Sequence, residues 1–303
     1  MMSAAHSLNI NYKKQKAMKK FQLGLAAAVM LTTISCTSEE PQAEKPTGME
    51  AKTITFTFGD TFQQRAMTRA EITSLGLTDL WMFDYVGEEL QQTIHQSSTD
   101  EGFGAISASM GYGTQILYFV ASRGTTPTTD TSAKTITWAK PSDTYWATTS
   151  ITVAPSSAAS QSITLGRVAT RLRITVTDEI PANAATFTVT PSQWYYGINY
   201  TTCAGVGLQA NYPRPVSIPA NYIGTSGELM ISIFGFVPSA DWQTDVTATL
   251  TASDESVLGQ VVLEDVTLNK NITTSYSGGI LGTAKAFTLT ADDAWGDDDI
   301  HTW

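Results

Sequence analysis

Helix-forming patterns, cysteine and histidine are all scarce in this chain of 303 residues. No stretch of a dozen residues combines a helical apolar period with caps, so a helical bundle is excluded. The two cysteines, Cys36 and Cys203, leave no disulfide framework, and three histidines scattered over the chain form no zinc-binding pattern. Nucleotide-binding loops and a nucleophile elbow are also missing. We therefore expect no enzyme activity, no cofactor and no metal.

Basic residues are few once the N-terminus is set aside. The net charge is −10, and residues 1–36 contribute five lysines and no acid, so the chain beyond Cys36 carries −15. An acidic protein of this kind is not expected to bind nucleic acid. Clustered aspartates near the C-terminus lack the spacing of a calcium-binding loop, so we expect a solvated acidic tail.

The first 36 residues are typical of a targeting segment. Five lysines precede an apolar run over Leu23–Ile34, which is too short to span a bilayer. The run ends in Thr33-Ile34-Ser35-Cys36, which resembles a bacterial lipoprotein signal whose cysteine receives the lipid. This resemblance implies an outer-membrane lipoprotein anchored through Cys36, with residues 37–50 as a tether. The alternative is a plain secretory signal.

The segment Lys52–Phe58 has a strict period of two. Ile54, Phe56 and Phe58 share one face and threonines the other, which predicts a half-buried β-strand. A polar stretch with two basic sites, Arg65-Ala66 and Arg69-Ala70, follows this strand. A strand joined to its domain through a protease-sensitive loop can be cut free. We therefore interpret this strand as a temporary filler that is released by cleavage after Arg65 or Arg69.

Short alternating segments with turn signals fill the rest of the chain, which predicts an all-β fold of two tandem sandwiches. We expect an N-terminal sandwich over 51–158 and a C-terminal sandwich over 159–303, with Thr125–Lys134 as a loop. The predicted strands are 77–85, 90–95, 103–110, 115–121, 135–138, 146–153, 162–165, 167–177, 186–190, 227–237, 246–252, 257–262 and 286–290.

The order of these features resembles the fimbrillin family of Bacteroidales, the pilins of type V pili. The matching segments are the signal with Cys36, the strand Thr53–Phe58 with its basic loop, Leu80–Tyr85, Gly113–Gly124 and Leu165–Pro181. The resemblance implies transthyretin-like (Greek-key) β-sandwiches and a cell-surface fimbrial location. It also implies removal of the first strand by an Arg-directed protease and polymerisation by strand exchange with other copies or other fimbrial subunits. Host or bacterial surface ligands are then expected as adhesion partners.

The C-terminal segment is the expected donor strand. Phe287-Thr288-Leu289-Thr290 alternates like Thr55–Phe58, and Trp295 and Trp303 flank the acidic tail. The alternative interpretation makes Phe287–Thr290 the last strand of the second sandwich. Both hold if only the tail beyond Ala291 is donated.

Two other functions stay open at this stage. One is an uncleaved anchor or accessory fimbrial lipoprotein, which would keep its lipid and its first strand. The other is a non-polymerising surface lipoprotein that binds glycans through Trp194, Tyr195, Tyr196 and Tyr200. For these aromatic residues, packing within the core is the competing expectation.

Overall fold

The structure is a computed structural model that describes residues 50–60, 75–239, 242–282 and 286–294. These residues form an all-β protein, and the predicted β-sandwich architecture is confirmed. The described residues contain a single 3-10 turn, Ala220–Tyr222, and no α-helix. None of them belongs to a helix with the length and apolarity needed to cross a membrane.

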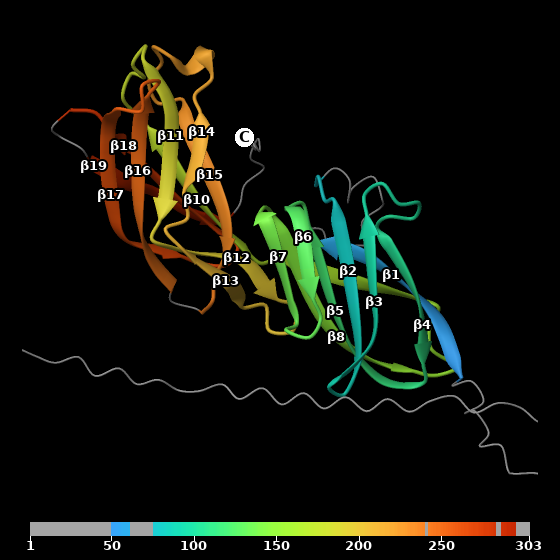
Figure 1. The fold of residues 1–303 in the computed structure, drawn as a ribbon. Coiled ribbons are helices and arrows are strands. Elements are labelled where there is room, and N and C mark those ends of the chain that lie inside the picture. The colour runs from blue at the N-terminus through green and yellow to red at the C-terminus, as the bar shows by residue number, and fades with distance from the viewer. Residues whose placement is uncertain (1–49, 61–74, 240–241, 283–285, 295–303) are drawn as a thin grey trace, which may run out of the picture. The chain divides into compact units, whose positions relative to one another are not determined.

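The N-terminal half forms one seven-stranded sheet that closes over its own core (Figure 1). Ile54, Phe56 and Phe58 on one part of the sheet pack against a core that includes Met82 and Phe119 on the other part. This arrangement makes a sandwich from a single sheet. The strand order is β3 (Glu89–Ser97), β2 (Asp79–Val86), β5 (Gly113–Ser122), β8 (Thr144–Val153), β9 (Ser160–Arg167), β1 (Ala51–Asp60) and β4 (Ala105–Gly111).

The C-terminal half builds a second sandwich from two four-stranded sheets, which share one core. One sheet contains β15 (Leu229–Phe236), β10 (Ala169–Val176), β18 (Ile272–Gly279) and β19 (Ala286–Ala294), in that order. The other contains β14 (Arg214–Ser217), β11 (Ala184–Pro191), β16 (Trp242–Ala252) and β17 (Val257–Leu268).

A third sheet combines segments from both halves of the chain, in the order β13 (Gly205–Ala210), β12 (Gln193–Asn199), β7 (Thr135–Lys140) and β6 (Thr125–Asp130). It contributes to a third apolar cluster with Trp81, Phe83 and Tyr85 of β2. Since Leu80 and Met82 on the opposite face of β2 belong to the first core, this strand is buried on both faces. The alternation predicted for β2 is confirmed.

One prediction about the middle of the chain needs correction. Residues 125–130 were expected in a loop, but they form β6, whose partner is β7. β9, which follows the predicted boundary between residues 158 and 159, pairs with β1 and with β8. The sheet that contains β1 therefore extends to Arg167.

Candidate functional site

The first strand, β1, lies between two neighbours. It pairs antiparallel with β4 over Ala51–Thr57, and parallel with β9 over Thr55–Asp60. A strand in this position satisfies backbone groups on both sides, so its loss would expose two unpaired strand edges. We call the space that β1 fills between β4 and β9 the β1 slot.

The apolar face of β1 is fully buried. Ile54, Phe56 and Phe58 each have 0% exposure. The Phe119 ring lies 5.3 Å from the ring of Phe56 and 5.4 Å from that of Phe58, in tilted and edge-on geometries that aromatic pairs favour. Burial stabilises the fold by about 1.5–3 kcal/mol for each of these side chains. The first core thus depends strongly on β1.

The opposite face of β1 is lined with hydroxyl groups and is partly open to solvent. Thr53 is exposed, and Thr55 and Thr57 are half-buried. The Thr55 hydroxyl lies 2.8 Å from the Ser107 hydroxyl on β4, and the Thr57 hydroxyl donates to the carbonyl of Gln161 on β9 at 3.4 Å. On this face of β1, these side-chain contacts therefore involve only small hydroxyl side chains.

Lys52 adds a contact that the sequence did not reveal. Its Nζ donates to the carbonyl of Pro155 at 2.7 Å and to that of Ser157, both in the turn between β8 and β9. This turn lies about a hundred residues away along the chain, and no local pattern links it to a lysine at the start of a strand. The bonds hold the first part of β1 against the turn that precedes β9.

The predicted cleavage residues Arg65, Ala66, Arg69 and Ala70 lie outside the described residues, as does Cys36. The chain is described again from Leu75, which packs against the first core. Beyond it, Leu77 is buried, and the amide of Thr78 donates to the carbonyl of Ser122 at 2.9 Å. The chain that follows both predicted cleavage sites is therefore attached to the first sandwich by contacts of its own, in addition to any through β1.

The expected donor residues Phe287 and Leu289 lie on β19, the last strand of its sheet. Among the described strands, β19 pairs with β18 alone. Phe287 is partly buried against the second core, whereas Leu289 is 50% exposed. This position agrees with the interpretation as the last strand of the second sandwich, and it leaves the tail open as the donated part. Trp295 and Trp303 lie outside the described residues.

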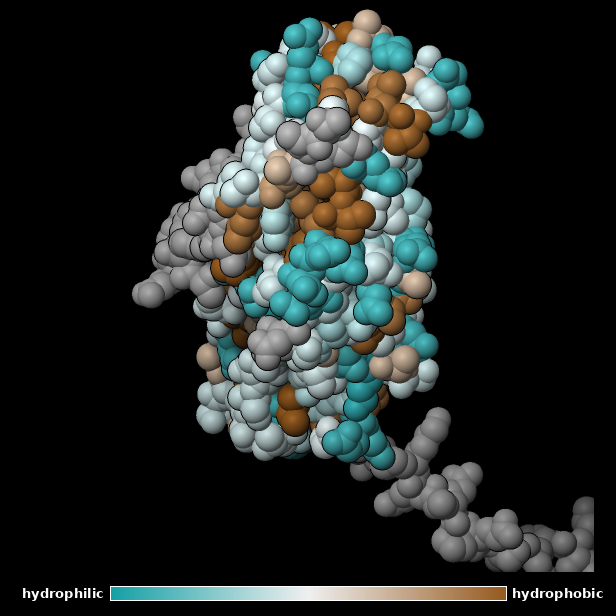
Figure 2. Space-filling model, turned by 90° about the vertical axis from the view of Figure 1, so that its left-hand side faces the viewer, coloured by the Kyte–Doolittle hydropathy of each residue, from teal (hydrophilic) through white to brown (hydrophobic). Residues whose placement is uncertain are grey.

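Apolar side chains are exposed on the part of the C-terminal half that contains β17 and β19. Figure 2 shows them gathered over this part of the surface. Besides Leu289, the exposed apolar residues include Val257 and Val262 of β17, which are 60% and 52% exposed. β17 and β19 end their respective sheets. Contiguous apolar surface of this kind marks contact sites more often than ordinary surface does.

The four aromatic residues considered for glycan binding do not form one exposed platform. Trp194 is fully buried, and its indole N–H donates to the carbonyl of Phe234 at 2.8 Å. A Cβ at Gly235 would lie 2.6 Å from the Trp194 ring, so glycine leaves the room that this ring needs. Tyr200 is also fully buried and stacks on Phe83 at 3.7 Å. Only Tyr195 and Tyr196 keep partial exposure, so core packing accounts for the larger part of this motif.

Asp84 and Asp143 are carboxyl groups buried within the first sandwich. Asp84 is 1% exposed and accepts a hydrogen bond from Gln92 Nε2 at 2.9 Å. Burial raises the pKa of Asp84, and the bond from Gln92 opposes part of that rise. Within the described ranges, no three acidic, histidine or cysteine side chains group as a metal site would require.

Comparison with family models and with curated protein sequences finds no match. Solved structures do resemble the chain. A candidate adhesin from Bacteroides ovatus has a TM-score of 0.49 and 9% identity, and the match covers 78% of this chain and 88% of the other. A candidate cell adhesion protein from the same species has a TM-score of 0.48 and 14% identity over 84% and 100% of the two chains. The fimbrial anchor protein Mfa2 from Porphyromonas gingivalis has a TM-score of 0.43 and 7% identity over 81% and 98%. The structural neighbours are thus adhesins and fimbrial proteins of Bacteroidales.

Proposed function

We propose that this protein is a structural subunit of a cell-surface fimbria whose first strand is a placeholder. The chain is exported as an outer-membrane lipoprotein through Cys36 and is cut after Arg65 or Arg69. It then polymerises when a strand from another subunit enters the β1 slot, and the polymer supports adhesion. A single observation carries the proposal: β1 is a central strand with three fully buried apolar side chains, yet it precedes a segment with two arginines.

The architecture of the slot supports strand exchange. An incoming strand would gain backbone hydrogen bonds from β4 and β9, and the first core would supply pockets for alternate side chains. Donor and acceptor are different surfaces of one molecule, so each added subunit leaves a new slot or a new donor free. Such head-to-tail contacts generate filaments rather than closed dimers.

The C-terminal segment has the pattern that the slot requires. Phe287-Thr288-Leu289-Thr290 repeats the alternation of apolar residues and threonine found in Ile54-Thr55-Phe56-Thr57, while Ala291 and Asp292 stand where β1 has Phe58 and Gly59. In β19 this segment is held on one side by β18, and Leu289 is half exposed. This segment, or the tail that follows it, is therefore our candidate for the strand that fills the β1 slot of another subunit.

Protease treatment of the purified chain tests the proposal. An arginine-specific protease should produce a new N-terminus at Ala66 or Ala70, and electron microscopy should then show filaments. The matched control carries Arg65→Gln and Arg69→Gln and should stay uncut and unassembled. A chain that remains uncut at both arginines would instead fit the uncleaved anchor or accessory subunit. A chain that is cut, keeps its fold without β1 and never assembles would contradict the proposal.

A further inference from the structure

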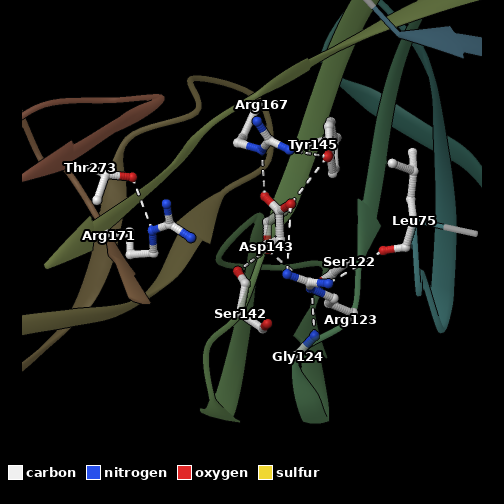
Figure 3. Close-up of polar contacts among 11 residues, drawn as sticks. Leu75, Ser122, Arg123, Gly124, Ser142, Asp143, Tyr145, Arg167, Arg171 and Thr273 are labelled. Carbon is white, nitrogen blue, oxygen red and sulfur yellow. Dashed lines mark hydrogen bonds and ion pairs between the residues drawn. The ribbon is translucent and has the colours of Figure 1, made fainter. Parts of the chain in front are cut away.

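A buried polar cluster lies where the two parts of the seven-stranded sheet meet (Figure 3). Arg167 at the end of β9 donates from Nε to Asp143 Oδ1 at 2.7 Å and from Nη2 to the Tyr145 hydroxyl at 2.6 Å. The Tyr145 hydroxyl in turn donates to Asp143 Oδ2 at 3.1 Å. We call Asp143, Tyr145 and Arg167 the Arg167 cluster.

The cluster forms charge-assisted bonds at low exposure, and Asp143 Oδ2 also lies 4.0 Å from Arg123 Nη2. The Arg167 side chain is 16% exposed and that of Asp143 is 4% exposed, so water screens the ion pair little. The guanidinium also lies over the Tyr145 ring, 5.0 Å from its centroid. A planar guanidinium can bind the carboxylate and the hydroxyl at once, which a lysine ammonium cannot do with the same geometry.

Apart from its pairing with β1, β9 has little backbone pairing with other strands. On one side it pairs with β1 from Ser160 to Leu165. On the other side it pairs with β8 only where Arg167 and Gly166 face Tyr145 and Trp146. No described strand flanks Ser160–Leu165 on that side. Release of β1 would therefore leave this segment without a backbone partner on either side, held by its two ends and by the packing of Ile163 and Leu165 in the first core.

The two ends of β9 differ in which contacts remain after β1 is released. At the Ser160 end, the bonds from Lys52 to the preceding turn leave together with β1. At the Arg167 end, the bonds to Asp143 and Tyr145 use no atom of β1, so they persist after its release. The amide of Val168 also donates to the carbonyl of Thr144 there, at 2.9 Å.

We infer that Arg167 is a positioning residue for strand exchange, which holds β9 in place as the parallel wall of the emptied β1 slot. The inference rests on the proposed release of β1. A wall that is already ordered lowers the entropic cost of capturing a strand, so Arg167 raises both the rate and the affinity of capture. The donor then meets β9 in the register that β1 had.

The second sandwich offers a matched control. Arg171 is 3% exposed and donates from Nε to the Thr273 hydroxyl at 2.9 Å, which connects β10 with β18 (Figure 3). It is a buried arginine that also joins neighbouring strands, but it lies in the second sandwich, whose core does not include β1. Its loss should lower general stability without changing the β1 slot.

The test uses the full chain after cleavage with an arginine-specific protease and removal of the cleaved segment that contains β1. A labelled peptide with the sequence Ala51–Asp60 serves as the probe, and its binding is followed by fluorescence anisotropy. We expect Arg167→Lys to bind the peptide at least tenfold more weakly than the wild-type chain, and Arg171→Lys to bind it like wild type. Hydrogen exchange of the cut chain without peptide should be faster at Ser160–Leu165 in Arg167→Lys, with no change in β4.

The outcomes separate this inference from the function on which it rests. Equal peptide binding by Arg167→Lys and wild type overturns the role of Arg167 and leaves the slot intact. Failure of the cut wild-type chain to bind the peptide overturns the slot itself, and this inference with it. If uncut Arg167→Lys does not fold, Tyr145→Phe decides, because it keeps the ion pair and removes the hydrogen bond from Arg167 Nη2 to the Tyr145 hydroxyl. We expect it to weaken binding severalfold, and unchanged binding would again overturn the role.

Discussion

β1 and β10 occupy equivalent places in the two sandwiches. Each lies between an antiparallel neighbour, β4 or β15, and a parallel neighbour, β9 or β18. Each points three apolar side chains into its core; in β10 these are Leu172, Ile174 and Val176. Position in the sheet therefore does not distinguish β1, the strand proposed to be exchanged, from β10.

The connections and the outer faces of the two strands do distinguish them. β10 follows β9 with Val168 alone between them, and its outer face includes buried Ala169 and Arg171. β1 carries partly open threonines on its outer face, and eighteen residues separate its end at Asp60 from the start of β2 at Asp79. These two differences are what the proposed function requires: β1 is buried on one face and followed by a long segment, while β10 is fixed by its neighbours in sequence.

The largest expected effect is the loss of β1 itself. Cleavage and removal of residues up to Arg65 should lower the free energy of unfolding of the first sandwich by about 5–9 kcal/mol, because three buried apolar side chains are lost. Guanidinium unfolding of cut and uncut chains measures this difference. Excess Ala51–Asp60 peptide should restore most of the stability. Equal unfolding curves for the two forms would show that β1 is dispensable.

A substitution in each strand sharpens the comparison. Phe56→Ala in β1 should cost about 3–5 kcal/mol, and Ile174→Ala in β10 about 2–5 kcal/mol, through the transfer and cavity terms. After cleavage, only Phe56→Ala should speed the release of β1, as measured by the appearance of free peptide. Faster release in Ile174→Ala would mean that the two sandwiches do not behave independently.

A smaller effect is expected at Lys52. Replacing it by methionine removes two hydrogen bonds to the turn before β9 but keeps the aliphatic stem, so the cost should be about 1 kcal/mol. Thermal unfolding of the uncut chain measures the cost, and release of β1 after cleavage should be faster. Lys270→Met, on an exposed lysine of the C-terminal half, serves as the control. The role of Lys52 is refuted if both variants behave alike.

The smallest effect concerns pH. Because burial raises the folded-state pKa of Asp84, the folded state binds its proton more tightly than the unfolded state does. Stability from this group is therefore lost as pH rises from the unfolded-state pKa through the raised folded pKa. Asp84→Asn should melt above wild type at neutral pH, and the difference should vanish below the ordinary aspartate pKa. A constant difference at every pH would contradict this account.

Strong alternation made much of the fold predictable from the sequence. The strands around Ile54 and Met82 were expected because their side chains alternate between two faces, and the strand around Leu117 because its apolar run is nearly continuous and is followed by a glycine. β6 was missed because its threonines, proline and aspartate are typical of loops, and its strand conformation depends on pairing with β7. β12, β13, β14 and β18 were missed for a related reason, since glycine, tyrosine, asparagine or serine interrupt their apolar period.

The candidate site was predictable only in part. The three buried residues of β1 followed from its period of two, but a period does not show which strands lie beside it. The parallel pairing with β9 joins residues about a hundred positions apart, as do the bonds of Lys52. Arg167 was expected only as part of a long strand, and its partners Asp143 and Tyr145 become visible only when β8 and β9 are brought together.

Sedimentation of the cleaved chain tests the central claim most directly. After cleavage, the account predicts large species at high protein concentration, which give way to subunits when excess Ala51–Asp60 peptide fills the slot. The contradicting result is a chain without β1 that sediments as a monomer at every concentration and melts at the same temperature as the uncut protein.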